Sequence, residues 1–335
     1  MYGACWRHVA PMAEESYVTA DGVFQFDTQG YLVLEEAVGS HDVRALREAA
    51  ARLEERSLYR DSECYDNPAG ERGPGVPEVL GFARTTFEGH SLRLNGCVSR
   101  EPLFHALIDY KPVLDYLRVF MGRPQFSHDW YIHKERGGRS SWWHRADEPA
   151  NHFRCDRQSG EIRCRQINVG WMLDDQGAED GTLLVVPGSH KQVSPDLDRD
   201  AYPGLLMPGA VPVVAKAGSV VIFTECLLHC GDRKRSEGPR RNLYFLYTDG
   251  SAADHTLPVP FVPAPPHRQA GGQPEWEEGD ARSSRREMQL YGPGSSLLFG
   301  KGVRGGVYWK TLTEQQRDVC GWMEHTAPVR SWAAM

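Results

Sequence analysis

Residues 219–230 read Ser-Val-Val-Ile-Phe-Thr-Glu-Cys-Leu-Leu-His-Cys, an apolar run that leads into a histidine. The run at 219–224 is typical of a buried β-strand, which would carry His229 to the mouth of a barrel. Further short segments of this kind alternate with turns rich in Gly and Pro. They span residues 126–134, 166–173, 182–186, 211–215 and 242–248. Many short strands divided in this way predict a mainly β sandwich or barrel.

Flanking helices are predicted on the N-terminal side of these strands, after a strand-like run at residues 31–34. Apolar residues recur on one helical face at Val43, Leu46, Ala50 and Leu53. They predict a helix over residues 40–55, with Ser40 as its N-cap, that packs outside a sheet. A second helical region, interrupted by a proline, is predicted over residues 102–121 and closed by Gly122.

One elaborated domain accounts for most of the chain. Residues 1–24 are expected to be an irregular N-terminal arm, residues 25–250 the main domain, and residues 251–335 an extension that packs on it. Residues 257–287 have the Pro- and Gly-rich composition of a mobile loop. Residues 60–96 are predicted to be a long loop that could form part of a lid. A helical capping box is expected near the C-terminal end, at Thr313 and Gln316.

The composition limits the classes of function. With 335 residues, 40% of them hydrophobic, the chain can bury a full core. A formal net charge of -7 argues against a nucleic-acid partner held through its phosphates, which would require a basic balance. The eight cysteines include no CxxC pair, so we expect reduced thiols in a cytoplasmic protein. We find no signal peptide and no apolar run of membrane-spanning length, so no membrane partner is expected.

Two histidines and an arginine are the candidates for chemistry. Residues i and i+2 of a strand share one face, so a His-x-Asp or His-x-Glu pair can bind one metal ion. A distant second His completes the two-His-one-carboxylate site of non-haem Fe(II) oxygenases. We assign His144 and His229 to such a site. Arg240, eleven residues after His229, could pair with the distal carboxylate of a dicarboxylic co-substrate.

Five separated motifs point to a known family. They are Leu173-Asp174-Asp175, the stretch from Gly181 to His190, the stretch from Ala217 to Phe223, His229, and Pro239-Arg240. Their order over residues 25–250 resembles the phytanoyl-CoA dioxygenase-type enzymes that depend on Fe(II) and 2-oxoglutarate. The resemblance implies a double-stranded β-helix, the cupin-like jelly roll, which uses Fe(II), 2-oxoglutarate and O2 and releases succinate and CO2. It also implies that Arg240 binds 2-oxoglutarate and that Trp171 lines the same pocket.

The stretch Trp143-His144-Arg145-Ala146-Asp147 departs from the family pattern, because Ala146 stands where the oxygenases carry Asp. Together with Ala150-Asn151, it is similar to the halogenase branch, in which the missing carboxylate leaves a coordination position for chloride. This resemblance implies hydrogen abstraction followed by chlorine transfer, with Asn151 near the chloride. As we align the strands, Val169 and Leu246 replace a Thr and an Arg that help to hold chloride in the carrier-protein-dependent halogenases.

The leading hypothesis is therefore a halogenase that chlorinates an aliphatic C–H bond of a small secondary-metabolite precursor, as in antibiotic biosynthesis. The alternative is a hydroxylase with Asp147 or water at the third metal position. Asp147, at i+3 from His144, should face away from the metal unless a bulge shifts the register. A second alternative is a non-catalytic jelly-roll binding protein that has lost its carboxylate.

Four residues are candidates for the substrate site. Arg145, Arg163 and Arg165 belong to a basic cluster that is either a solvated loop or a clamp for a phosphate or carboxylate. Trp142 could form a wall of the substrate pocket, although a core role is the commoner one for tryptophan. This set is compatible with a small-molecule substrate that is free, phosphate-bearing and nucleotide-like, or tethered to a carrier protein.

Overall fold

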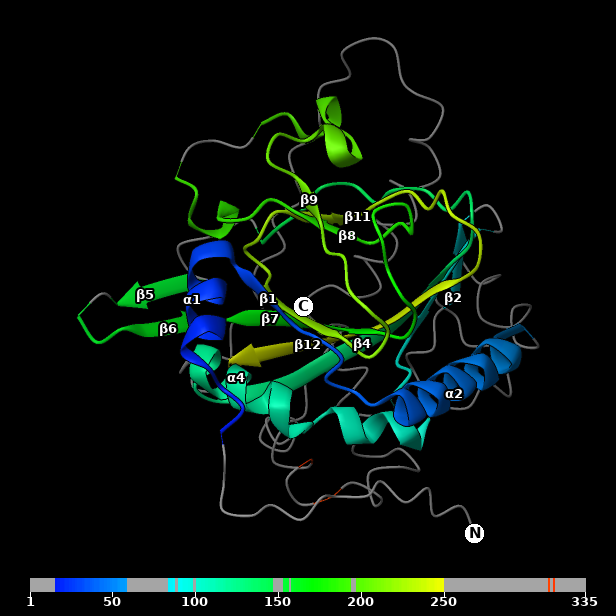
Figure 1. The fold of residues 1–335 in the computed structure, drawn as a ribbon, viewed down its shortest axis with the longest axis horizontal. Coiled ribbons are helices and arrows are strands. Elements are labelled where there is room, and N and C mark those ends of the chain that lie inside the picture. Colours follow the sequence, from blue (N-terminus) through cyan, green and yellow to red (C-terminus); the bar gives the residue numbers. More distant parts are fainter. Residues whose placement is uncertain are drawn as a thin grey trace, which may run out of the picture.

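Two antiparallel sheets form the body of the protein (Figure 1). The computed structural model describes residues 16–58, 84–87, 90–98, 101–146, 153–156, 158–193, 197–249, 313 and 316. The large sheet has the strand order β1 (Tyr31–Leu34), β10 (Val220–Thr224), β7 (Gln166–Met172), β12 (Arg240–Asp249), β4 (Pro124–Lys134), β3 (Ser91–Asn95) and β2 (Arg84–Phe87). The small sheet has the order β11 (His229–Gly231), β8 (Leu183–Val185) and β9 (Val211–Pro212).

The two sheets enclose a buried interior. Successive side chains of a strand point to opposite faces, so Val221 and Phe223 of β10 turn inward while Ile222 turns outward. The inward side chains pack against Leu183 and Val185 of the small sheet. We call the face of the large sheet that is turned toward the small sheet the inner face. This arrangement confirms the predicted jelly roll.

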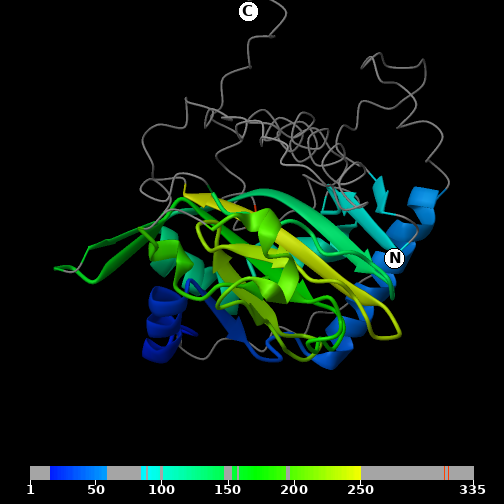
Figure 2. The same cartoon turned by 90° about the horizontal axis from the view of Figure 1, so that it is seen from above.

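Helices cover the opposite, outer face of the large sheet. They are α1 (Ala20–Gln29), α2 (Ser40–Leu58), the 3-10 helix η1 (Pro102–Leu107) and α4 (Lys111–Met121). Their apolar residues join the outward side chains of the large sheet in the larger core cluster. Figure 2 shows α1 and α2 near opposite ends of the sheet. Three short 3-10 helices lie in the connections, η2 (Ser189–Lys191), η3 (Arg199–Ala201) and η4 (Gly204–Leu206).

Several expectations from the sequence are confirmed. The strand at residues 31–34 is present, and the second helical region is divided into η1 and α4 as its proline suggested. Gly122 ends α4 with a φ of 77°. Thr313 and Gln316 form the reciprocal capping box, with hydrogen bonds of 3.0 and 3.1 Å. The amide of Gln316 also donates to the carbonyl of His105 in η1 at 2.9 Å, so this residue of the C-terminal extension contacts the main domain.

Other expectations were wrong. Helix α1 begins at Ala20, inside the predicted irregular arm of residues 1–24, because Thr19 accepts a capping hydrogen bond from the Gly22 amide at 3.0 Å. The predicted loop at residues 60–96 contains strands β2 and β3. A hairpin of β5 (Phe153–Asp156) and β6 (Glu161–Cys164) was not predicted, and it projects from the body of the molecule (Figure 1). The predicted mobile loop at residues 257–287 lies outside the described residues.

The described part of the chain contains no helix that is long and apolar enough to cross a membrane.

Five cysteines of the described residues are free thiols, at positions 97, 155, 164, 226 and 230.

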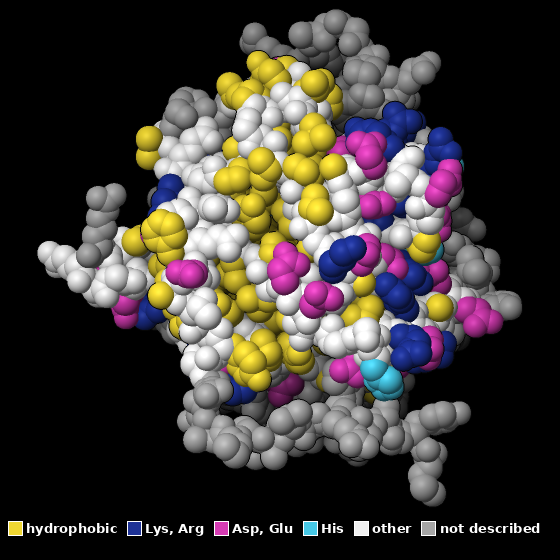
Figure 3. Space-filling view, in the orientation of Figure 1, with side chains coloured by type: hydrophobic (Ala, Val, Ile, Leu, Met, Phe, Trp, Pro, Cys, Tyr) yellow, Lys and Arg dark blue, Asp and Glu magenta, His cyan; other side chains and the backbone are white. Residues whose placement is uncertain are grey.

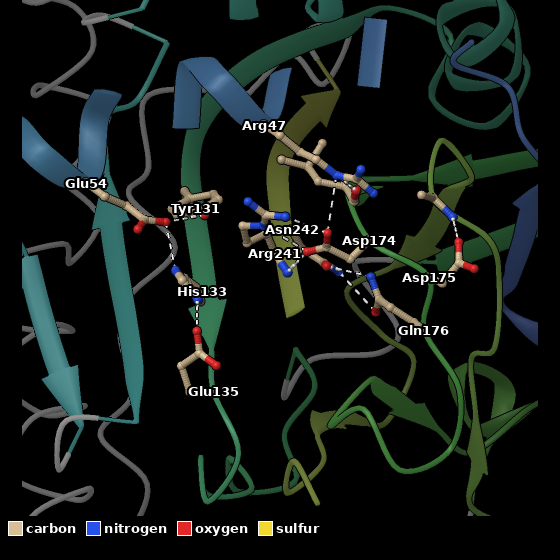
Figure 4. A network of polar contacts seen from close by, with 12 residues as sticks. Arg47, Glu54, Tyr131, His133, Glu135, Asp174, Asp175, Gln176, Arg241 and Asn242 are labelled. Carbon is tan, nitrogen blue, oxygen red and sulfur yellow. Dashed lines mark hydrogen bonds and ion pairs between the residues drawn. The ribbon is translucent and has the colours of Figure 1, made fainter. Parts of the chain in front are cut away.

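A polar network attaches α2 to the outer face of the sheet (Figure 4). Glu54 of α2 accepts hydrogen bonds from Tyr131 at 2.5 Å and from His133 at 2.8 Å, both on β4. Burial alone would lower the pKa of His133, but the hydrogen bond to Glu54 and its charge raise that pKa above 6.5. Burial would likewise raise the pKa of Glu54, yet the hydrogen bonds from His133 and Tyr131 bring it below 4.5. The ion pair therefore favours the folded state.

We expect Glu54→Gln to lower the free energy of unfolding by about 1 to 2 kcal/mol near pH 6, where the pair is charged. The raised pKa of His133 means that its contribution is complete below pH 6.5 and is lost as the pH rises through the folded value. The lowered pKa of Glu54 means that its contribution is lost at the acid end. Urea unfolding at pH 6 and pH 9 tests this, with Glu55→Gln on the same helix as control. An equal cost at both pH values would contradict the assignment.

Candidate active site

The two predicted histidines lie side by side. His229 begins β11, and its backbone exchanges two hydrogen bonds of 3.0 Å with the backbone of His144. The centres of the two imidazole rings are 4.2 Å apart, at an interplanar angle of 52°. The structure thus brings together residues that are 85 positions apart in the sequence.

Both imidazole rings engage Nδ1 with a backbone carbonyl, which leaves Nε2 as the atom available for a ligand. The Nδ1 atom of His144 lies 2.9 Å from the carbonyl of Trp142, and that of His229 lies 2.7 Å from the carbonyl of Leu227. A carbonyl oxygen can only accept, so each Nδ1 carries the proton and each Nε2 keeps its lone pair. Burial lowers the pKa of His229 to about 4, and burial together with the charge of His229 lowers the pKa of His144. Two neutral imidazoles with oriented Nε2 atoms are a suitable pair of metal ligands.

The third position of a facial triad is not filled by the residue two positions after His144. Ala146 is half-buried, packs against the larger core cluster, and donates its backbone N–H to the carbonyl of Glu225 at 2.7 Å. Among the described residues, no three His, Cys, Asp or Glu side chains converge as a ready metal site. Asp147, the rival ligand, and Asn151, the predicted chloride contact, lie outside the described residues.

A carboxylate that the sequence analysis missed lies on the same side of the site. Glu225 follows β10 directly, and its side chain accepts a hydrogen bond from the amide of Asn168. Asn168 pairs with Phe223 across β7 and β10, so both side chains are on the inner face. The Phe223 ring is in turn 4.9 Å from the ring of His229. Burial raises the pKa of Glu225, while the charge of His144 opposes that shift.

A buried arginine lies elsewhere on the inner face. Arg240 begins β12, is 2% exposed, and donates to the hydroxyl of Tyr244 at 3.0 Å and to Oε1 of Gln176 at 3.3 Å. Both partners are neutral, and no carboxylate of the described chain forms an ion pair with this guanidinium. A buried charge is costly unless it is paired. Arg240 therefore offers a binding position for an anion.

One interior contains both the arginine and the histidines. Tyr244, which contacts Arg240, and Phe223, which contacts His229, belong to the same buried cluster between the sheets. Trp130 stacks on Tyr244 with ring centres 5.4 Å apart. Gly170 leaves room for the Tyr244 ring, because a Cβ at position 170 would lie 2.9 Å from Cε1 of Tyr244. Arg240 and His229 thus both contact side chains of one buried cluster between the sheets.

Trp171 does not fit the role that the resemblance implied. Its side chain is on the outer face, in the larger core cluster, with ring centres 5.7 Å from Tyr110 and 6.0 Å from Phe245. Val169 shares that face. Leu246 does face inward, as its pairing with Asn168 shows.

The arginines of the predicted basic cluster lie in different surroundings. Arg145, next to His144, donates to the carbonyl of Ser189 at 2.7 Å. Arg163 lies in the projecting β5–β6 hairpin, where it pairs with Glu161 at 3.1 Å. Arg165 is half-buried just before β7. The structure gives no support for a shared phosphate clamp. Trp142 is 41% exposed, and its ring lies 4.9 Å from that of His144, at the outer side of the site.

Comparisons with known proteins identify the family. The profile of the phytanoyl-CoA dioxygenase (PhyH) family matches residues 26–242. The ectoine dioxygenase of Sphingopyxis alaskensis is 24% identical over 282 residues, which cover 76% of this chain and 81% of that protein.

Two solved structures share the fold. HygX from Streptomyces hygroscopicus, with nickel, 2-oxoglutarate and hygromycin B bound, has a TM-score of 0.53 and 20% identity, and the match covers 70% of this chain and 88% of HygX. EctD from S. alaskensis with bound Fe has a TM-score of 0.50 and 20% identity, with coverage of 72% and 80%.

We expect His144→Ala and His229→Ala each to weaken Co(II) binding by more than about 100-fold, which exceeds the usual cost of losing an outer hydrogen-bond partner of a ligand. Isothermal titration calorimetry measures the affinity. His41→Ala, a change at an exposed histidine of α2, should bind as the wild type does. Thermal melts establish that each variant is folded. Unchanged affinity in either folded histidine variant would exclude that residue as a ligand.

Proposed function

The chain belongs to the phytanoyl-CoA dioxygenase family, and from its site we propose that it is an Fe(II)- and 2-oxoglutarate-dependent hydroxylase of a small polar molecule. One observation carries the proposal. Two neutral imidazoles with free Nε2 atoms share an interior with Arg240, a buried guanidinium whose two hydrogen-bond acceptors are neutral. This combination suits a metal ion and a dicarboxylate together.

Each part of the site has a distinct task. His144 and His229 would hold iron through Nε2, because their Nδ1 atoms are engaged by backbone carbonyls. Arg240 would pair with the distal carboxylate of 2-oxoglutarate, with Tyr244 and Gln176 fixing the orientation of the guanidinium. A bound Fe(II) ion would supply, with O2, the oxidative decarboxylation of 2-oxoglutarate to succinate and CO2, coupled to hydroxylation of a substrate C–H bond.

The substrate would approach from the side of Trp142. That residue is partly exposed beside His144, whereas Phe223 and Tyr244 close the interior from within. Other exposed apolar residues include Leu205, Leu206 and Val214. Figure 3 shows hydrophobic side chains gathered over the small sheet and the segments beside it. The names of the relatives, an ectoine dioxygenase and a HygX complex with hygromycin B, support a small and polar substrate.

Chlorination is the second candidate, and Ala146 is the observation that favours it. The missing carboxylate at this position could admit chloride next to the histidines. The carboxylate of Glu225 on the same side would disfavour that reaction in its ionised form, because two negative charges in one site repel each other. The similarity to an ectoine dioxygenase also supports hydroxylation.

The product distinguishes the two candidates. Wild-type protein, Fe(II), 2-oxoglutarate, O2 and a panel that includes ectoine and hygromycin B should form succinate together with a hydroxylated product, even at saturating chloride. Mass spectrometry identifies the product. A chlorinated product in its place would overturn the hydroxylase proposal and favour the second candidate. In that case Ala146→Asp should suppress chlorination.

Arg240→Ala should raise the KM for 2-oxoglutarate by about 10- to 100-fold, the effect of losing a charge-assisted hydrogen-bonded pair. The next residue of β12 offers a matched control. Arg241 is on the outer face, where it donates to Asp174 at 2.7 and 2.9 Å. Arg241→Lys should therefore leave the KM unchanged. Succinate formation at varied 2-oxoglutarate concentrations measures both. Equal effects in the two variants would contradict the assigned role of Arg240.

A further inference from the structure

The carboxylate of Glu225 has no assigned task in the site described so far. Its backbone is anchored beside Ala146, because the carbonyl of Glu225 accepts the N–H of Ala146 at 2.7 Å. A turn closed by the hydrogen bond from Leu227 to Thr224, 2.9 Å long, then leads to His229. Glu225 is thus held next to the segment that carries His144. It also precedes His229 by four residues.

The direction of the side chain is set by the large sheet. Asn168 of β7 donates to the carboxylate of Glu225, and Asn168 is paired with Phe223 on the inner face. Phe223 contacts the ring of His229. The carboxylate is therefore on the inner face, where Phe223 connects it to the ring of His229.

The surroundings of the carboxylate are those of a metal ligand. Its hydrogen bond comes from a neutral amide, and no Lys or Arg of the described chain forms an ion pair with it. A half-buried carboxylate of this kind would be stabilised by a nearby cation. Carboxylates that bind metal ions are themselves held by hydrogen bonds, and Asn168 can hold one oxygen while the other remains available.

We propose that Glu225 supplies to iron the carboxylate that Ala146 cannot, so that a two-His-one-carboxylate site forms with its carboxylate on the turn between β10 and β11. The inference rests on the proposed function, since it assigns a third ligand to the same metal. The three side chains do not converge on one point in the described structure, so the Glu225 side chain has to rotate toward the histidines when the metal binds. The position that chloride would need is then filled.

Metal affinity provides the first test, independent of turnover. Glu225→Gln keeps the size of the side chain and its contact with Asn168, and it should weaken Co(II) binding at least 10-fold in isothermal titration calorimetry. Asp147→Asn removes the rival carboxylate and should bind Co(II) as the wild type does. Wild-type affinity in folded Glu225→Gln would overturn the inference, as would weakened binding in Asp147→Asn alone.

Chloride titration provides the second test. The visible absorption of the Co(II)-loaded wild type should not respond to chloride, because the third position is occupied. Glu225→Ala, which opens that position without a charge, should show a chloride-dependent change. A response in the wild type as large as that in the variant would overturn the inference.

The two proposals fail in different ways. If the wild type consumes 2-oxoglutarate and Glu225→Gln still binds Co(II) normally, the function stands and the role of Glu225 is wrong. If Glu225→Gln loses metal affinity but the wild type forms no succinate with any substrate, the ligand stands and the proposed function is wrong.

Discussion

The paired backbone hydrogen bonds between His144 and His229 are the constraint on which the site depends. They connect the segment before Ala146 to β11 and place both imidazoles on one side. The carbonyls of Trp142 and Leu227, each two residues before its histidine, then fix both rings in the same tautomer. Because backbone atoms set this geometry, it persists whatever the third ligand is. The identity of that ligand is left to side chains that reach the site from elsewhere.

Two ionisable side chains of opposite type, neither with an ion-pair partner among the described residues, lie on the inner face. Arg240 has neutral partners, and Glu225 is held by the amide of Asn168. Each arrangement is costly for the charged form, because a charge removed from water loses the stabilisation that water would give. A cation beside Glu225 and a dicarboxylate beside Arg240 would compensate both costs. The electrostatics of the interior therefore favour the joint binding of a metal ion and an anionic co-substrate.

Features that depend on local sequence pattern were predicted well. The face of the sheet to which a given side chain points was predicted poorly. The strands at residues 31–34 and 219–224 follow from apolar runs, and His229 follows from its place after the second. Trp171 was assigned to the wrong face because neighbouring residues of β7 alternate, and Met172 is the one that turns inward. The β5–β6 hairpin was missed because charged residues dominate its exposed faces.

Glu225 escaped notice for a different reason. It stands in the apolar stretch that predicts the fold, where a carboxylate is conspicuous. The His-x-Asp pattern, however, concerns only the position two residues after His144. A side chain from a neighbouring turn can reach the same place. The backbone pairing of His144 with His229 brings β11 and the turn before it alongside residues 144–146. An alanine after the first histidine therefore shows only that the carboxylate is not supplied locally. Whether chloride can bind depends on the charged side chains that the rest of the fold brings to the site, and Glu225 is one of them.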